Sequence, residues 1–296
     1  MHCARRIAKK LHISCFPPPR HDAGARSGVH SGKENNMKAR ILLVCGAIAS
    51  GGLISAAAAE TEIGLFPGTI SANVTLATDY AFRGISQTDE DPAIQGGFDY
   101  EVETGVLGTS AYLGIWASNL DFNDGDEASI EVDLYGGFTG EVAGIGWDVG
   151  FIYYAYPGAA SSLDYDFWEV TTGLSYSPLD RVEVGVRYNY SPDYFGGSGA
   201  GHFVEGTMSV SVPLPEVLAG RGLGLSLDGS IGHQWIGNND VFGTPNYLTW
   251  SIGASLSYKF LSLGVAYVDT DLSKSECFDR TGLCGARAIG TLTATF

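Results

Sequence analysis

Few residues in the main part of the chain, residues 60–296, have side chains suited to catalysis. This part holds two histidines, His202 and His233. Neither stands in a recognisable Ser–His–Asp arrangement, and no G-x-S-x-G nucleophile motif occurs. His233 shares the alternation of apolar residues beside Trp235, and His202 opens a strand after a glycine-rich stretch. We therefore predict no catalytic residue and no enzymatic activity.

An acidic stretch, Asp-Phe-Asn-Asp-Gly-Asp-Glu at residues 121–127, invites comparison with a calcium loop. Calcium prefers carboxylate and carbonyl oxygens as ligands. The stretch does not keep the twelve-residue spacing of an EF-hand. We interpret it as a solvated acidic loop, and we predict neither a metal site nor a cofactor.

Two cysteines, Cys277 and Cys284, remain once the first 59 residues are set aside, since Cys3, Cys15 and Cys45 lie in that leader. A structural zinc site needs about four ligands, and no others cluster nearby. An even number of cysteines in an exported protein favours a disulfide. We predict that Cys277 and Cys284 form a bond that pins a local loop.

The leader has two parts. Residues 1–36 are basic and without a period, which predicts a disordered, over-extended start ahead of the true initiator Met37. Residues 37–59 follow a signal-peptide pattern: Lys38 and Arg40, an apolar run over 41–53, and small residues that predict cleavage after Ala59. An uncleaved membrane anchor is the alternative. Residues 60–68 would then be a short periplasmic segment.

Composition limits the class of protein. The chain has 296 residues, 45% hydrophobic and 17% charged, with a mean hydropathy of +0.07, which excludes intrinsic disorder. The leader holds nine of the 17 basic residues and two of the 33 acidic ones. Residues 60–296 therefore contain eight basic and 31 acidic residues, a net charge of −23. So acidic a chain is not expected to bind nucleic acid.

Apolar side chains recur at every second position along the chain from residue 69, which is the period of a strand. The clearest segments are 71–83, 94–103, 130–138, 182–190 and 248–260. Seven weaker ones follow the same rule: 109–118, 146–156, 166–176, 202–212, 223–235, 261–269 and 286–296. No helical period competes over 69–296.

The connections between these segments alternate between short turns and longer polar loops, apart from one longer turn at 213–222. Even strand numbers, with short turns at one end and long loops at the other, are typical of outer-membrane barrels. We predict an all-β fold over residues 69–296: a transmembrane antiparallel β-barrel of 12 strands. A soluble sandwich or lipocalin-like barrel is the alternative, because its strands would alternate as well.

Aromatic residues on the apolar face favour the membrane barrel. We expect them in two belts at the bilayer interfaces. The belt at the loop end would hold Tyr80, Phe82, Trp168, Tyr188, Tyr190, Trp250 and Tyr267; the one at the turn end would hold Trp147, Tyr176, Tyr258, Phe260 and Phe296. Phe296 closes the last alternating segment, and we expect it to be the signal that the barrel assembly machinery recognises.

Several motifs resemble the TorF-type family of proteobacterial outer-membrane porins, a family formerly of unknown function. They are Thr75–Gln87 (TLATDYAFRGISQ), Gly114–Asn119, Glu131–Gly137, Tyr153–Pro157 and Tyr267–Asp271. The resemblance covers nearly all of residues 60–296. It implies an outer-membrane location and channel activity, and it carries over no functional residues.

The polar face of the strands would line the lumen, and acids outnumber bases on it. The expected selectivity residues are Asp79, Arg83, Asp99, Glu101, Glu103, Glu131, Asp133, Asp148, Glu169, Glu183, Arg187, Glu205, Asp228, Lys259 and Arg287. The arginines are suited to bridging carboxylates across the wall. Inward glycines such as Gly97, Gly114, Gly150 and Gly232 are expected to leave open space.

These features predict a porin-like channel in the outer membrane for passive diffusion of small hydrophilic solutes or ions. Fixed carboxylates concentrate counter-ions, so the preference should be for cations. The expected partners are outer-membrane lipids, the assembly machinery and the solutes themselves. Two alternatives remain: a non-conducting structural or surface barrel, and a barrel enzyme that acts on envelope lipids.

Overall fold

The computed structural model describes residues 61–62, 67–122 and 128–296. The predicted over-extended start at 1–36 and the signal peptide at 37–59 lie outside these described residues. So do residues 60 and 63–66 of the predicted periplasmic segment, and residues 123–127 of the acidic loop. The two described residues before 67 form the short strand β1 (Thr61–Glu62), which pairs with the start of β2.

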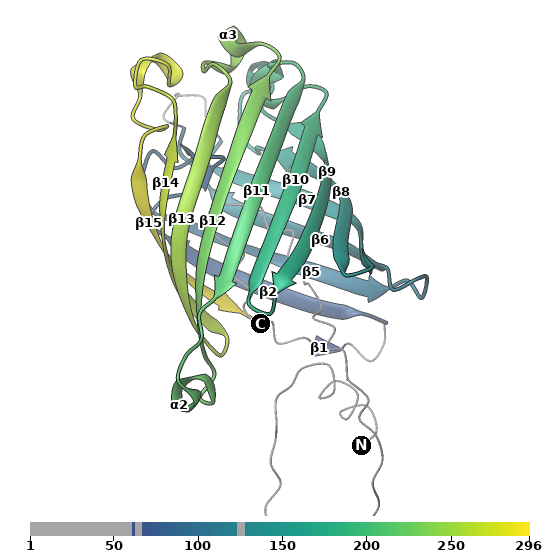
Figure 1. The fold of residues 1–296 in the computed structure, drawn as a ribbon. Coiled ribbons are helices and arrows are strands. Elements are labelled where there is room, and N and C mark those ends of the chain that lie inside the picture. Colours follow the sequence, from purple (N-terminus) through teal and green to yellow (C-terminus); the bar gives the residue numbers. More distant parts are fainter. Residues whose placement is uncertain (1–60, 63–66, 123–127) are drawn as a thin grey trace, which may run out of the picture. The chain divides into compact units, whose positions relative to one another are not determined.

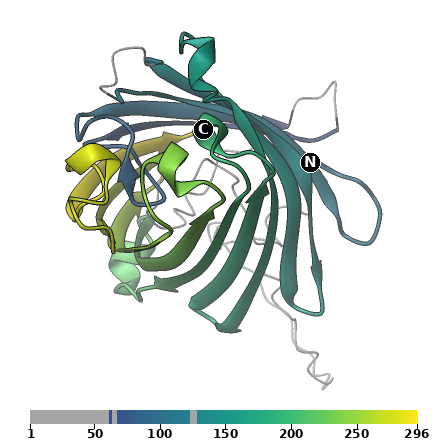
Figure 2. The same cartoon turned by 90° about the horizontal axis from the view of Figure 1, so that it is seen from above.

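Within the described chain, twelve antiparallel strands form one closed ring (Figure 1). Each strand pairs with the next along the chain, and β2 pairs with both β5 and β15, which closes the ring seen from above in Figure 2. The strands are β2 (Thr69–Ala77), β5 (Ala93–Glu103), β6 (Ser110–Asn119), β7 (Ile130–Val142), β8 (Ile145–Ala155), β9 (Phe167–Leu179), β10 (Val182–Ser191), β11 (Gly201–Ser211), β12 (Leu223–Ile236), β13 (Tyr247–Tyr258), β14 (Leu261–Thr270) and β15 (Arg287–Thr295).

The predicted barrel of twelve strands is therefore confirmed, and its boundaries follow the alternation of the sequence closely. Side chains of one parity point out of the ring and are apolar and exposed, as with Phe98 at 64%, Ile252 at 66% and Val265 at 57%. Side chains of the other parity are mostly polar and point inward. None of the helices in the described residues is long and apolar enough to cross a membrane.

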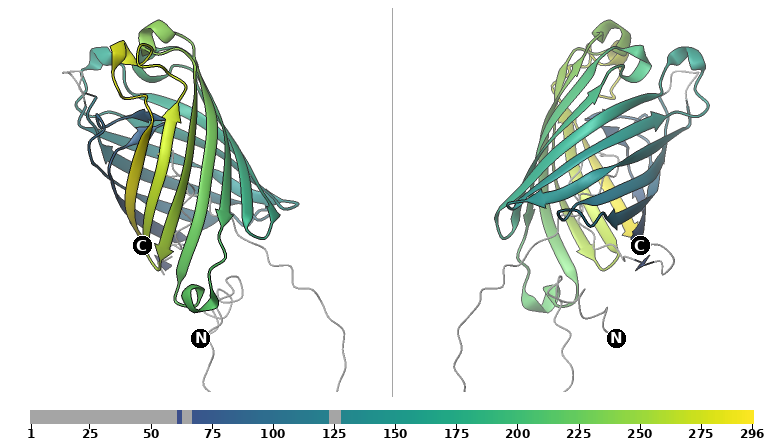
Figure 3. Two further views of the ribbon diagram at one scale, coloured as in Figure 1. Left: turned by 60° about the vertical axis from the view of Figure 1, so that its left-hand side comes forward. Right: turned by 90° about the vertical axis from the view of Figure 1, so that its right-hand side faces the viewer.

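The connections also alternate as predicted (Figure 3). At one end of the barrel, which we call the turn end, the strands are joined by short links and by a longer one that contains α2 (Glu216–Ala219). At the other, the loop end, the links are long. They contain the hairpin β3 (Ala81–Phe82) and β4 (Ile85–Ser86), the single turns η1 (Ser161–Leu163), η2 (Phe195–Gly197) and η3 (Phe278–Arg280), and the helix α3 (Asn239–Phe242).

One strand prediction is wrong at its end. The alternation over 71–83 predicts a single strand that places Tyr80 and Phe82 in the outer aromatic belt. In the structure β2 ends at Ala77, and Tyr80 is fully buried. The chain leaves the wall after Ala77, and Arg83 and Gly84, with positive φ angles of 49° and 86°, then turn it back in the tight β3–β4 hairpin.

Candidate functional site

The link between β2 and β5, residues 78–92, folds into the barrel over the largely buried residues 79–86, and residues 89–92 are exposed. We call the whole link the inward segment. Its side chains contact inward-facing residues on most of the wall. At Gly84 the inward segment lies very close to strands β13 and β14. A Cβ atom at this position would clash with Thr249 on β13 and Thr270 on β14. Glycine is needed at this position both for that approach and for its φ of 86°.

Aromatic and carboxylate groups hold the first half of the inward segment. The hydroxyl of Tyr80 donates a 2.9 Å hydrogen bond to Oε1 of Glu131, and the Tyr80 ring lies 5.5 Å from that of Trp116. Phe82 packs edge-on against Tyr154, with ring centroids 5.8 Å apart. These partners lie on β6, β7 and β8, so this half of the segment is held by three neighbouring strands.

Arg83, the basic residue of the inward segment, connects it to two further strands. Its Nη2 lies 2.6 Å from Oε2 of Glu169 on β9, and its Nη1 donates a 2.8 Å hydrogen bond to Oε1 of Gln234 on β12. Burial is the largest single effect and opposes the charge on Arg83, but Glu169, Tyr194 and Tyr154 together outweigh it and raise the pKa of Arg83 above its ordinary value. The guanidinium therefore remains charged while bridging the lumen.

A second ion pair fixes the beginning of the segment. Nη1 of Arg287 on β15 lies 3.0 Å from Oδ2 of Asp79, whose Oδ1 accepts a 2.7 Å hydrogen bond from the Ser86 hydroxyl. The backbone of Ser86 in turn donates to the carbonyl of Leu283 at 2.9 Å. Arg83 and Arg287 each pair with a single carboxylate, and both pairs join the inward segment to the wall rather than bridging carboxylates along it.

Rings from several loops pack above the inward segment. Tyr165 and Phe195 stack with centroids 4.3 Å apart, Phe122 lies 5.6 Å from each, and Phe167 on β9 extends the group to Tyr194 at 4.9 Å. Together with the inward segment these rings fill the loop-end half of the barrel. This half is packed like the core of a soluble protein.

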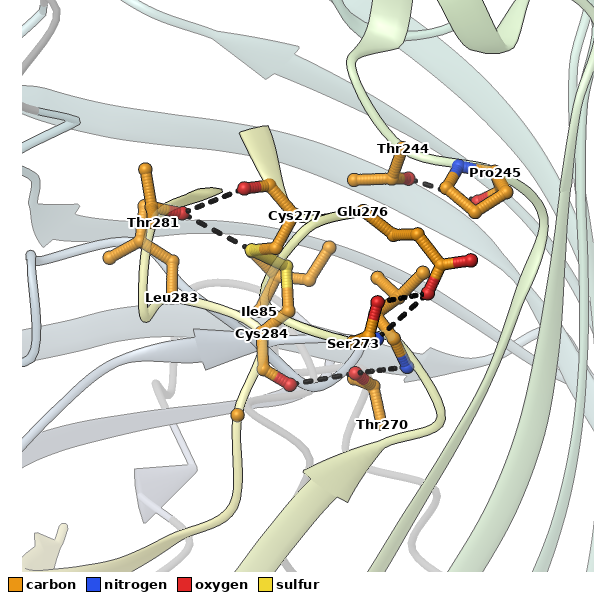
Figure 4. The surroundings of a disulfide bond; sticks show 12 residues. Ile85, Thr244, Pro245, Thr270, Ser273, Glu276, Cys277, Thr281, Leu283 and Cys284 are labelled. Atoms are coloured by element: carbon orange, nitrogen blue, oxygen red, sulfur yellow. Dashed lines mark hydrogen bonds between the residues drawn. A yellow bond between two sulfur atoms is a disulfide. The ribbon is translucent and has the colours of Figure 1, made fainter. Parts of the chain in front are cut away.

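The predicted disulfide is confirmed between Cys277 and Cys284, whose Cα atoms are 5.9 Å apart. Both cysteines are buried in a cluster with Ile85 of the inward segment (Figure 4). The Thr270 hydroxyl donates a 2.7 Å hydrogen bond to the Cys284 carbonyl. The bond therefore stabilises a loop that rests on the inward segment.

Replacing both Cys277 and Cys284 with serine should release this loop while leaving the barrel closed. A loop this short contributes about 2–3 kcal/mol through the entropy of the unfolded chain. We expect trypsin to cut after Lys274 and Arg280 at least about tenfold faster, since 1.4 kcal/mol is a factor of ten. Cleavage after Arg221, in the opposite turn, is the internal control. Equal cleavage rates in both proteins would contradict a clamping role for the bond.

Three of the inward glycines, Gly114, Gly150 and Gly232, do not leave open space, contrary to the expectation from sequence. A Cβ atom at Gly114 would clash with the ring of Tyr135, and one at Gly232 would lie 2.5 Å from the ring of Phe203. At Gly150 it would lie 2.5 Å from the hydroxyl of Tyr112. Aromatic side chains from neighbouring strands occupy the room that these glycines provide.

The turn-end half of the lumen is more accessible. Asp99, Glu101 and Glu183 point inward there and are each partly exposed, as is Arg187. Asp99 accepts a 2.5 Å hydrogen bond from the hydroxyl of Tyr135. We call these three acids the vestibule carboxylates, because they line the part of the lumen that solvent can enter.

The two sides of the wall differ in chemistry. The inward carboxylates lie on β5 and β7–β12, while β13–β15 and β2 present hydroxyl groups instead. The hydroxyls pair across strands: Ser230 with Ser251 at 2.9 Å, and Thr75 with Thr293 at 2.8 Å. Apart from Arg287 on β15, a solute in the lumen would therefore meet negative charge on one side and neutral hydrogen-bonding groups on the other.

The structure brings most predicted lumen residues inside the ring. Fully or nearly buried are Asp79, Arg83, Glu131, Asp133, Asp148, Glu169, Glu205 and Asp228; partly exposed are Asp99, Glu101, Glu183, Arg187 and Arg287. Arg187 lies opposite Glu205 in the register of β10 and β11. Glu103 is exposed at the end of β5.

Lys259 does not line the lumen, contrary to the prediction. It lies in the turn between β13 and β14, with a φ of 56°. It is exposed, and its Nζ is 5.2 Å from the ring centre of Tyr258, an outward residue. The lumen also holds partners that the sequence reading missed, above all Gln234 and Phe203. Both have inward parity, which is the signal that could have identified them.

The two histidines lie on the outer face. Nδ1 of His202 is 2.8 Å from the hydroxyl of Tyr188, and the ring of His233 packs against Trp235 at 4.1 Å. Neither contacts a serine or an acid through a hydrogen bond recorded among the described residues. Nor do the described residues contain three or more His, Cys, Asp or Glu side chains arranged to hold a metal ion.

Comparison with known proteins gives one family match. A family model described as a bacterial protein of unknown function, Gcw_chp, matches residues 62–296. No curated protein matches the chain significantly.

Among solved structures, the NanC porin is 9% identical with a TM-score of 0.45, over 77% of this chain and 98% of that one. The KdgM porin in complex with disordered oligogalacturonate is 8% identical with a TM-score of 0.43, over 77% and 98%. LpxR from Salmonella typhimurium is 11% identical with a TM-score of 0.43, over 76% and 99%.

Proposed function

The chain belongs to the Gcw_chp family, described as bacterial proteins of unknown function, and we propose that it forms an outer-membrane channel for small hydrophilic solutes and ions with a preference for cations. The TorF-type porin assignment, drawn from the sequence motifs, is part of this proposal. So are the signal peptide and the recognition of Phe296 during assembly. Phe296 is 54% exposed and its ring stacks on that of Phe260.

The outer surface supports the location. A closed ring has no strand edge left unpaired, which is what a sheet needs to cross hydrocarbon. The outward residues between the two ends are aliphatic and exposed, as with Leu113 at 60% and Leu263 at 59%. Exposing so much apolar surface to water would be costly for a soluble protein.

The observation that carries the function is the set of vestibule carboxylates, which are partly exposed inside a closed ring. Carboxylates that face a water-filled lumen attract cations and repel anions. The inward segment closes the loop-end half in this structure. Permeation therefore requires the segment to move, and we propose that the structure represents a closed state.

The filled loop-end half also favours a second candidate, a non-conducting barrel. The packed rings and two ion pairs would suit a structural protein that never opens. A barrel that never opens would show no current in its native form, whereas a channel that is closed in this structure would show discrete openings.

Neutralising the vestibule carboxylates together, as Asp99→Asn, Glu101→Gln and Glu183→Gln, should reduce the preference for cations. One charge about 7 Å from the ion path is worth about 0.6 kcal/mol in water, or about threefold in cation occupancy. We expect the ratio of potassium to chloride permeability to fall at least about threefold.

The measurement is the reversal potential in a potassium chloride gradient across a planar bilayer. The matched control neutralises three exposed acids outside the lumen, as Asp180→Asn, Glu216→Gln and Asp240→Asn, and should keep the native ratio. An unchanged ratio in the lumen variant would argue against these carboxylates as the origin of selectivity.

A further inference from the structure

The guanidinium of Arg83 is enclosed on all sides by groups that bind cations. Glu169 and Gln234 accept its two hydrogen bonds, at 2.6 and 2.8 Å. Its Cζ atom also lies near three ring centres, at 4.4 Å from Phe203, 4.7 Å from Phe82 and 5.7 Å from Tyr194. Carboxylate, amide oxygen and aromatic faces together form a cage for a planar cation.

Most of this cage does not belong to the segment that carries Arg83. Glu169, Phe203 and Gln234 lie on β9, β11 and β12, and Tyr194 lies on the loop between β10 and β11. Glu169 is oriented by two further groups, the Asn189 amide at 3.0 Å and the Tyr154 hydroxyl at 3.3 Å. The wall would therefore keep the cage if the Arg83 side chain were removed.

Two further carboxyl groups lie on the wall near the cage. Glu131 and Asp133 lie on the inward face of β7, and Asp133 pairs in register with Tyr154, which bonds to Glu169. Asp133 is completely buried, and neither of its carboxylate oxygens has a hydrogen-bond partner among the residues that the structure describes. A buried carboxylate without a partner is costly. If Arg83 withdrew, Glu169 would also lose its counter-ion, so the site would favour another cation in its place.

We propose that this cage is a binding site for solutes that carry a guanidinium group, and that Arg83 occupies it in the closed state in place of such a solute. The inference rests on the proposed function only for the route by which a solute would reach the cage. An alkali ion would bind to the cage more weakly, because it cannot donate hydrogen bonds to Glu169 and Gln234. Solute and Arg83 would compete, so an occupied site excludes the docked inward segment.

The test uses guanidinium chloride as the probe and the Arg83→Ala variant, refolded in detergent. Guanidinium has four heavy atoms, so an affinity of about 1 mM is near what so small a ligand reaches. At about 10 mM guanidinium, against equal sodium chloride, the unfolding midpoint of this variant should rise by about 3 °C. The native chain, with its cage occupied, and an Arg221→Ala control should not shift.

The double variant Arg83→Ala/Glu169→Gln should lose the shift, because it lacks the carboxylate that the guanidinium would contact. No shift in Arg83→Ala, or an equal shift in the native chain or in the double variant, would overturn the proposal. If Arg83→Ala refolds poorly in sodium chloride, recovery of folding by about 10 mM guanidinium would support the site. Equal failure in both salts would overturn it.

Thermal unfolding needs no current through the barrel, so this result is independent of channel activity. A guanidinium shift without conductance would reject the proposed function and keep the site. Conductance without the shift would reject the site alone.

Discussion

Replacing Glu169 with alanine is expected to lower the free energy of unfolding by about 3–5 kcal/mol. The change leaves the buried guanidinium of Arg83 without its counter-ion, and removing one partner of a buried ion pair typically costs that much. It also leaves the amide of Asn189 without the oxygen to which it donates. Unfolding by urea in phospholipid vesicles would measure the loss.

Two further variants show whether the loss comes from the ion pair. Glu216→Ala, at an exposed carboxylate on α2, should change stability by less than about 0.5 kcal/mol. In Arg83→Ala/Glu169→Ala the cost should be smaller than the sum of the single changes, because no charge is left without its partner. Additive effects would show that Arg83 and Glu169 do not act as a pair.

The second large effect is expected when the inward segment is taken out of the lumen. Ala77 and Ala93 are direct partners in the register of β2 and β5, so a linker of about four residues can join the strands in place of residues 79–91. Removing the segment takes away Tyr80, Arg83 and Ile85, which occupy the loop-end half. We expect single-channel conductance several-fold above that of the native chain.

The matching control shortens a link that does not enter the barrel. Residues 213–221, which contain α2, lie at the turn end and can be replaced in the same way. This change should leave conductance at the native level. An equal rise in both variants would point to a general loosening of the barrel. No conductance after removal of residues 79–91 would favour the non-conducting alternative.

The wall of the barrel could be predicted from the sequence because lipid and lumen impose opposite chemistry on successive residues. Along β13, for instance, Trp250 and Ile252 alternate with Thr249 and Ser251, and the structure keeps this order. The positions of the turns and loops followed from the same alternation. Local pattern is sufficient there because each strand meets the same two environments.

The same reasoning failed at residues 79–83, where alternation continues although the chain has left the sheet. Tyr80 and Phe82 have the spacing of lipid-facing residues, but their partners Glu131 and Tyr154 are distant in sequence. Only tertiary contacts decide between a ring in lipid and a ring in the lumen. The local signal of departure was Arg83-Gly84, where a turn with positive φ is easily formed.

The filling of the lumen by aromatic rings could also be predicted in part from the sequence. Inward parity places Tyr112, Trp116, Tyr135, Tyr154 and Phe203 inside the ring. The outward aromatic residues do not indicate these rings, and inward glycines considered without the rings predict empty space. A glycine beside an inward ring on the neighbouring strand, such as Gly114 beside Tyr135, indicates packing rather than a channel. The Arg83–Glu169 pair depends on the inward segment and was not predictable as a pair.

The most direct test of the channel is the current carried by the refolded native chain in a planar bilayer under a potassium chloride gradient. We expect discrete openings, with a reversal potential displaced toward the equilibrium potential of potassium. A displacement toward that of chloride would contradict the role of the lumen carboxylates. Absence of discrete current both in the native chain and after replacement of residues 79–91 would contradict the channel itself.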